Sequence, residues 1–159
     1  MRFARTLQLL LGAALLPLAA ATSAAATPRH PDPRLDPAAV VRIQLEALAH
    51  NDKPSADAGL GVVFSFASPG NREHTGPLEH FVAMIHATYG QLLNYRSAHL
   101  SKLVMQDDQA LQGVELVDRK GQTARFVFVL SRQTEPPYAG CWMTDGVLPQ
   151  PDDADKQEM

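Results

Sequence analysis

Residues 66–77 hold the densest group of polar side chains that could bind a ligand. The stretch is rich in turn-forming residues, since proline fixes φ, glycine permits positive φ, and Ser and Asn bond nearby backbone. It therefore predicts a loop that presents Asn71, Arg72 and His74 together on the surface. There Arg72 could bind a carboxylate or a phosphate, with Ser68 and Thr75 beside it. The alternative is a rigid connection between two helices, in which Thr75 caps the second helix and Arg72 forms a local ion pair.

Three further residues could act as a general acid or base: Tyr89, His99 and Glu115. His99 and Glu115 fall within expected strands, where alternation leaves one face in solvent. Glu115 could face the interior only if Val114 and Leu116 pack the other way. The ordinary interpretation leaves His99 and Glu115 solvated and places Tyr89 in the core. No acid–base pair can be assembled from these positions, so we predict no catalytic residue and keep Tyr89 as a candidate ligand contact.

Metal binding is disfavoured by the spacing of the histidines. His74, His80 and His86 are each six residues apart. Six residues advance about 600° along a helix, short of two full turns, whereas joint ligation needs an i, i+4 pair. The chain also lacks a Gly-rich phosphate loop after a strand and a Gly-x-Ser-x-Gly elbow. We therefore expect no metal and no cofactor.

Two residues near the end of the chain occur once each. Cys141 is the only cysteine, so an internal disulfide cannot form, and we expect a buried, inert thiol. An intermolecular bridge or a reactive thiol is the alternative. Trp142 is the only tryptophan, and we expect it in the core or at the rim of a pocket, where it would contact a ligand.

Residues 1–26 have the order basic, apolar, small that is typical of a secretory signal peptide. An uncleaved membrane anchor is the alternative, because about 20 apolar residues can span a bilayer. Pro17 and an alanine-rich second half favour cleavage after Ala26 instead. We therefore expect a periplasmic or secreted protein with no stable membrane anchor after cleavage.

Cleavage would leave 133 residues, enough for one domain with its own core. The mature chain would carry 12 basic and 17 acidic residues, a net charge of −5, because two arginines leave with the peptide. Since no basic stripe appears, nucleic acid and anionic membrane surfaces are poor partners.

The mature chain divides into a Pro-rich extended tether over residues 27–35, a single domain over 36–148 and a disordered acidic tail over 149–159. Three helices are expected first in the domain. Asp36 is a favourable N-cap for a helix that ends near residues 51–52. A second helix over 54–66 is weakened by its glycines, and a third over 78–92 has clear 3.6-residue apolar spacing.

Four strands are expected next, over residues 97–105, 110–117, 123–131 and 141–147. Alternation is clearest in the third, where Phe126, Phe128 and Leu130 face one way. Helices followed by an antiparallel meander predict an α+β fold, in which the three helices pack on one face of a curved sheet of about four strands.

A pattern of residues extends over nearly the whole expected domain: Gln44, Leu45, Leu48, Asp52, residues 66–72 and 75–77, Phe81, Met84, Tyr89 and residues 142–147. It resembles a family of small bacterial and plant proteins that is classed as a domain of unknown function. It is also similar to the nuclear-transport-factor-2-like superfamily. That resemblance implies a cone-shaped α+β fold, with a helical layer cupped by a bent sheet. It implies no activity, because the superfamily includes isomerases, dehydratases and non-catalytic binding and dimerising modules.

The sequence therefore favours an exported, non-catalytic module. We expect it to bind a small apolar or amphipathic ligand, or a protein partner, through the cone or the open sheet face, and to form a homodimer through the sheet. The alternative is a small lyase or isomerase that uses Tyr89, His99 or Glu115 inside the cone.

Overall fold

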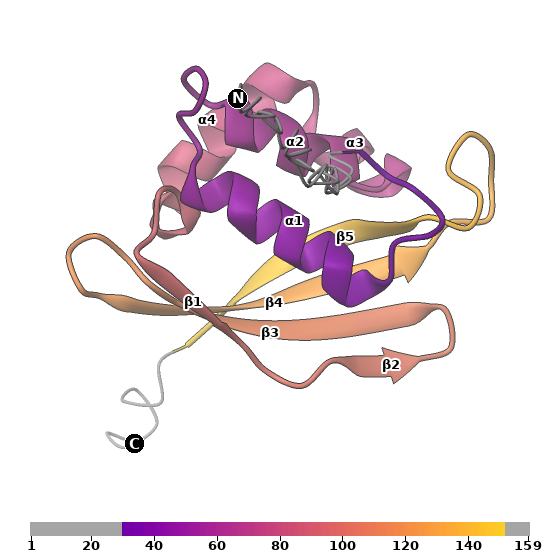
Figure 1. Cartoon of the computed structure of the whole chain (residues 1–159). Helices are drawn as coiled ribbons and strands as arrows, with labels where there is room; N and C mark the ends of the chain where they lie inside the picture. Colours follow the sequence, from indigo (N-terminus) through magenta and orange to yellow (C-terminus); the bar gives the residue numbers. More distant parts are fainter. Residues whose placement is uncertain (1–29, 152–159) are drawn as a thin grey trace, which may run out of the picture.

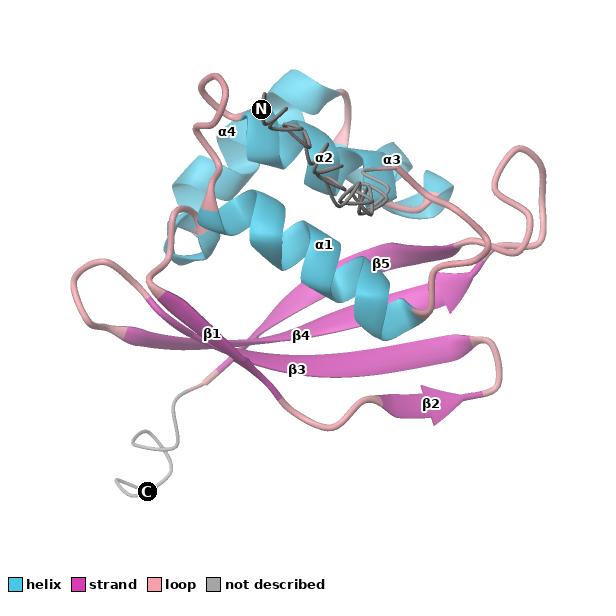
Figure 2. Ribbon diagram, viewed as in Figure 1, coloured by secondary structure: helices cyan, strands magenta, loops and turns pink. Residues whose placement is uncertain are grey.

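The computed structural model describes residues 30–151, so the expected signal peptide and residues 152–159 lie outside the described residues. Helices form one layer and an antiparallel sheet forms the other (Figures 1 and 2). The helices are α1 (Pro37–Ala49), α2 (Ala58–Phe66), α3 (Pro69–Thr75), α4 (Leu78–Thr88) and the 3-10 helix η1 (Gly90–Leu92). The strands are β1 (Ser97–Leu100), β2 (Val104–Gln106), β3 (Gln109–Val117), β4 (Thr123–Arg132) and β5 (Trp142–Gln150). The predicted α+β class is confirmed.

Helix α1 begins where the sequence predicts it. The Asp36 carboxylate accepts a hydrogen bond of 2.7 Å from the Ala39 N–H, and Pro37 occupies the first helical position. The cap satisfies one of the N–H groups that have no partner inside the helix. The face that follows is apolar and packs on the sheet, with Val40, Val41 and Leu48 buried.

Residues 66–77 are not the loop that the sequence predicts, because they contain helix α3. Its start repeats the arrangement at α1: the Ser68 hydroxyl accepts from the Asn71 N–H at 3.3 Å, and Pro69 is the first helical residue. This cap-and-proline pair outweighs the turn preference of the Gly-Asn that follows it. Gly76, with a φ of +73°, ends the helix in the region that glycine alone adopts freely.

The single strand expected over residues 97–105 is divided into β1 and β2. Both pair with β3, one at each end of it, and the sheet order is β1-β3-β4-β5. Between them the Ser101 N–H donates to the Gly113 carbonyl at 2.9 Å. Strand β5 lies at an edge of the sheet and runs to Gln150, so Pro149 and Gln150 belong to it and not to the tail. An edge strand tolerates Pro149 because its outer side needs no N–H donor.

The core lies between the two layers. Its largest fully buried side chains come from both: Leu48, Leu60, Phe66, Leu116, Phe128 and Leu130. Burying a side chain of this size stabilises the fold by roughly 1.5–3 kcal/mol. Leu35, which falls in the expected tether, also packs against this core. None of the helices between residues 30 and 151 has the length and apolar character needed to span a lipid bilayer.

Candidate functional site

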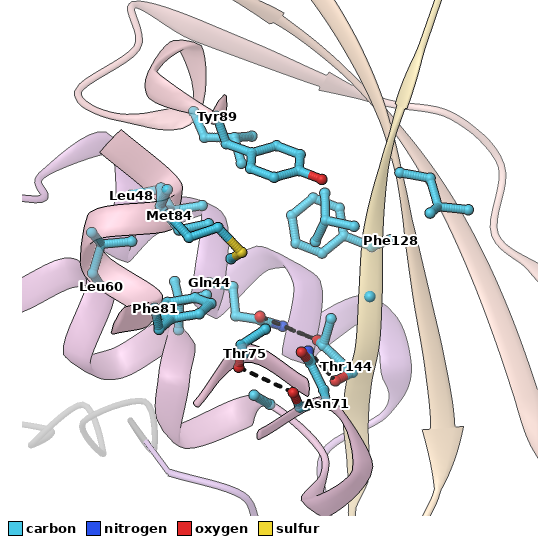
Figure 3. A pocket seen from close by; sticks show the side chains of 17 residues that line it. Gln44, Leu48, Leu60, Asn71, Thr75, Phe81, Met84, Tyr89, Phe128 and Thr144 are labelled. Atoms are coloured by element: carbon cyan, nitrogen blue, oxygen red, sulfur yellow. Dashed lines mark hydrogen bonds between the residues drawn. The ribbon is translucent and has the colours of Figure 1, made fainter. Parts of the chain in front are cut away.

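A cavity of about 180 Å³ lies between the helical layer and the inner face of the sheet (Figure 3). Its inner wall consists of fully buried side chains, including Leu48 of α1, Leu60 of α2 and Phe128 of β4. The partly exposed lining residues come from α3, from α4 and the residue that follows it, and from β5, and among them are Met84 and Tyr89. The mouth of the cavity is therefore between helices α3 and α4 and the edge strand β5.

Two buried polar residues lie in the wall of this cavity. The Gln44 amide nitrogen donates to the Thr144 hydroxyl at 2.8 Å, and that hydroxyl donates to the Gln44 Oε1 at 3.1 Å. Thr144 faces inward because a bulge in β5 pairs it with Leu130 and leaves Asp145 out of the ladder, exposed. The two side chains satisfy each other, as buried polar groups must.

Two polar residues of α3, Asn71 and Thr75, form a polar lip beside the mouth. The Thr144 carbonyl accepts from the Ser68 N–H at 2.9 Å and from the Asn71 Nδ2 at 3.0 Å, which ties α3 to β5. The Thr75 hydroxyl donates to the Asn71 carbonyl at 3.0 Å. Asn71 and Thr75 both line the cavity (Figure 3). The prediction that Thr75 caps the next helix is wrong, since Pro77 is the N-cap residue of α4.

Arg72 turns away from the cavity and fastens α3 to two neighbouring segments. Its guanidinium lies 5.4 Å from the ring centroids of both Phe64 and Tyr138. It also donates to the Tyr138 hydroxyl at 3.1 Å and to the Ser65 carbonyl at 2.7 Å. The local ion pair considered for Arg72 does not form among the described residues. Its two terminal nitrogens are thus engaged, its buried Nε has no hydrogen-bond partner among the described residues, and the guanidinium is not part of the cavity lining.

The seven candidate ligand contacts from the sequence separate into two groups. Asn71, Thr75 and Tyr89 come together at the cavity. The remaining four candidates serve other parts of the fold. Ser68 caps α3, and Arg72 connects α3 to two neighbouring segments. The exposed His74 has its Nδ1 2.7 Å from the Gly70 carbonyl oxygen, and Trp142 packs against the core outside the cavity lining.

The sequence did not predict Gln44 and Thr144 as lining residues, although both belong to the residue pattern that resembles the family. Gln44 is a polar residue inside the apolar stripe of α1, a signal that could have marked it. Thr144 could not have been found in this way, because its direction depends on the bulge in β5.

The three acid–base candidates do not converge. Tyr89 lines the cavity, whereas His99 and Glu115 are paired opposite each other on strands β1 and β3. Val114 and Leu116 are buried, so Glu115 points to the outer face of the sheet. There it accepts a hydrogen bond of 2.8 Å from the Arg125 Nε.

The histidines that are spaced six residues apart lie in separate surroundings. His86 Nε2 lies 2.8 Å from the Asp57 carboxylate, while His74 bonds within its own helix. Within residues 30–151, no three His, Cys, Asp or Glu side chains gather closely enough to hold a metal ion. Cys141 is buried as predicted, and burial raises the pKa of its thiol.

Comparison with curated proteins and with solved structures finds no match for this chain. The likeness to the nuclear-transport-factor-2-like superfamily therefore stays a prediction. A family model described as "Domain of unknown function (DUF4864)" matches residues 34–155, which include all the helices and strands described above. The chain belongs to that family.

Proposed function

We propose that this domain binds a small apolar or amphipathic ligand in the cavity between its helices and its sheet, without catalysing a reaction. The observation that carries the proposal is the cavity itself, whose volume is about 180 Å³ and whose inner wall is mostly apolar. An apolar cavity of about 150 Å³ is large enough for benzene. The space therefore suits about six to eight non-hydrogen atoms, with the rest of the ligand reaching through the mouth.

The distribution of titratable groups supports binding over catalysis. General acid–base chemistry needs a positioned proton donor or acceptor beside the reacting atoms. Among the lining residues only Tyr89 can titrate. His99 and Glu115 lie on the far face of the sheet, so the lyase or isomerase considered from the sequence would have Tyr89 alone.

Thermal unfolding in the presence of toluene or octan-1-ol tests the proposal. A ligand at a hundred times its Kd stabilises a protein by about 2.7 kcal/mol, which raises the Tm of a domain of this size by several degrees. Met84 points into the cavity (Figure 3), so Met84→Trp should fill the space and abolish the rise. Ala83→Trp is the matched control, because Ala83 is exposed on the same helix.

The proposal fails if neither compound raises the Tm of the unchanged protein, or if Met84→Trp and Ala83→Trp behave alike. Steady turnover of a substrate that is lost in Tyr89→Phe would instead support the enzymatic alternative.

We also propose that the protein works outside the cytoplasm, because residues 1–26 follow the order of a signal peptide. Native mass spectrometry of the protein purified from its own compartment would test this together with ligand binding. The expected species begins at Thr27 and carries a small co-purifying molecule. A cytoplasmic protein that begins at Met1 would contradict export.

A second candidate function is self-association through the outer face of the sheet. Three apolar side chains on this face are strongly exposed: Val104 at 56%, Leu111 at 42% and Leu148 at 53%. Val127 and Val129 lie between them in the ladder. Contiguous apolar surface of this kind marks interaction sites, and a homodimer would cover it.

A further inference from the structure

We infer that the ligand of this cavity has an uncharged polar end that both donates and accepts hydrogen bonds, such as an alcohol or a primary amide on a short hydrocarbon body. The inference rests on the proposed function and specifies the chemistry of its ligand. It is drawn from the charges and hydrogen bonds around the mouth.

Among residues 30–151, no charged side chain lines the cavity. Its polar side chains are two amides, two threonine hydroxyls and one phenol, from Gln44, Asn71, Thr75, Thr144 and Tyr89. A carboxylate or an ammonium group entering this space would lose part of its hydration and would meet no opposite charge, which is strongly unfavourable.

Arg72, which is next to Asn71 in the chain, does not supply a positive charge to the cavity. Arg72 donates to Ser65 and Tyr138 and lies between two aromatic rings, and it is not among the residues that line the cavity. Moving its guanidinium to a carboxylate in the cavity would break all of these contacts. The helix lip therefore recognises its ligand without a counter-charge.

Two groups at the lip can hydrogen-bond to a ligand, the Asn71 side-chain amide and the Thr75 hydroxyl. A carbonyl oxygen can only accept, so the Asn71 nitrogen must face the Thr144 carbonyl, and this fixes the Asn71 Oδ1 on the other side of the amide. One N–H and the Oδ1 of Asn71 enter no further bond among the described residues. The Thr75 hydroxyl already donates to the Asn71 carbonyl, so it can only accept from a ligand.

The deeper polar pair does not compete for the ligand. Gln44 and Thr144 hydrogen-bond to each other in both directions, and both are buried. The surrounding wall of Leu60, Phe81 and Phe128 is apolar. A hydrocarbon body thus fits the interior while its polar end stays at Asn71 and Thr75.

Isothermal titration calorimetry with four ligands of equal chain length tests the inference: octan-1-ol, octanamide, octanoate and octylammonium at pH 7. We expect the alcohol and the amide to bind at least tenfold more tightly than either ion. Octane, in a parallel thermal-shift measurement, should stabilise the protein less than octan-1-ol at equal concentration. Octanoate or octylammonium binding as tightly as octan-1-ol would overturn the inference and leave ligand binding itself intact. Failure of all the compounds to bind would instead remove the proposed function.

A variant pair checks that the lip provides the recognition. Thr75→Val removes the accepting hydroxyl with little change in shape and should weaken octan-1-ol about fivefold, while the stabilisation by octane stays the same. Thr88→Val, on the exposed end of α4, is the matched control and should change neither. Equal octan-1-ol affinities for Thr75→Val and the unchanged protein would contradict the assignment of the polar end to this lip.

Discussion

Asn51 is a fully buried amide that follows α1, and its hydrogen bonds connect this segment to the start of α2. Its Oδ1 accepts from the Leu60 N–H at 3.0 Å, and its Nδ2 donates to the Asp57 carboxylate at 2.8 Å. The same carboxylate lies 2.8 Å from His86 of α4. These hydrogen bonds lower the pKa of Asp57, and a hydrogen bond donated by the Asn94 side-chain amide lowers the pKa of Asp52. Asn51 and Asp57 together thus connect the end of α1, the start of α2 and helix α4, in part through a carboxylate that becomes protonated in acid.

We predict that the domain loses stability as the pH falls below about 4, the usual pKa of an aspartate. A carboxylate with a lowered pKa in the folded state contributes stability above its unfolded pKa, and this is lost as the pH falls through the folded value. Asp57→Asn removes one such group and should flatten the dependence of the unfolding free energy on pH between 5 and 2. Urea unfolding at a series of pH values measures this dependence for both proteins. Asn suits the positive φ of residue 57, so the backbone stays unstrained. A slope equal to that of the unchanged protein would show that Asp57 makes no such contribution.

Part of the candidate site could be predicted from the types of single residues. Asn71, Thr75 and Tyr89 were identified by their types and lie at the cavity. The expectation for Arg72 was a presented cation, but its surroundings depend on Tyr138, which is 66 positions away in the chain. The type of a side chain limits the chemistry available to it, whereas its direction depends on distant contacts.

At the scale of elements, helices α1 and α2 approach so closely that only glycine fits between them. A Cβ on Gly59 would lie 2.8 Å from the Asn51 Cα and would also collide with the Ala47 carbonyl oxygen. The Gly59 N–H donates to the Asn51 carbonyl at 2.9 Å across the same contact. From helix propensity, the glycines of α2 were expected to weaken this helix. In the structure, Gly59 allows α1 and α2 to pack in close contact, which helix propensity does not predict.

The two glycines of α2 make a matched pair for experiment. Gly59→Ala should destabilise the domain by about 3 kcal/mol, since the helices must move apart to admit the methyl group. Gly61→Ala meets no atom within 4 Å and should stabilise by up to about 1 kcal/mol through helix propensity. Urea denaturation gives both values. Equal effects of the two substitutions would rule out the close approach as their cause.

Elements were predictable where a local signal decides them. The Asp36-Pro37 and Ser68-Pro69 pairs both start helices, but only the first was recognised, because Gly70 and Asn71 after the second favour turns. The alternation of β4 predicted that Phe126, Phe128 and Leu130 face one way, and all three are buried in the core. The bulge in β5 has no comparable local signal, since it follows from pairing with β4.

At the scale of the whole molecule, the order of helices and strands was enough to predict two layers, but not the hollow between them. Its polar wall joins Gln44 to Thr144, which are 100 positions apart. The cavity therefore depends on how the layers meet, and no window of sequence contains that information. The same applies to the outer face of the sheet, which becomes a surface only when β2, β3, β4 and β5 are in register.

The outer face of the sheet is the surface that we propose for self-association. A two-fold interface must be complementary to itself, and a hydrogen-bonded pair of opposite charges, Glu115 and Arg125, lies beside the apolar side chains. The exposed side chains Val104, Leu111 and Leu148 would supply most of the association energy through burial.

We therefore predict that the mature protein is a dimer at tens of micromolar, as measured by sedimentation equilibrium. Leu111→Asp should convert it to a monomer, because it places a charge opposite apolar surface in both copies at once. Thr134→Asp is the matched control, since Thr134 is exposed in the connection between β4 and β5 and lies outside the sheet. Apolar burial drives the association, so raising the salt concentration should weaken the dimer only slightly. A monomer at several hundred micromolar would show that the apolar face has another occupant or none, and it would leave the proposal for the cavity on the opposite side of the sheet unaffected.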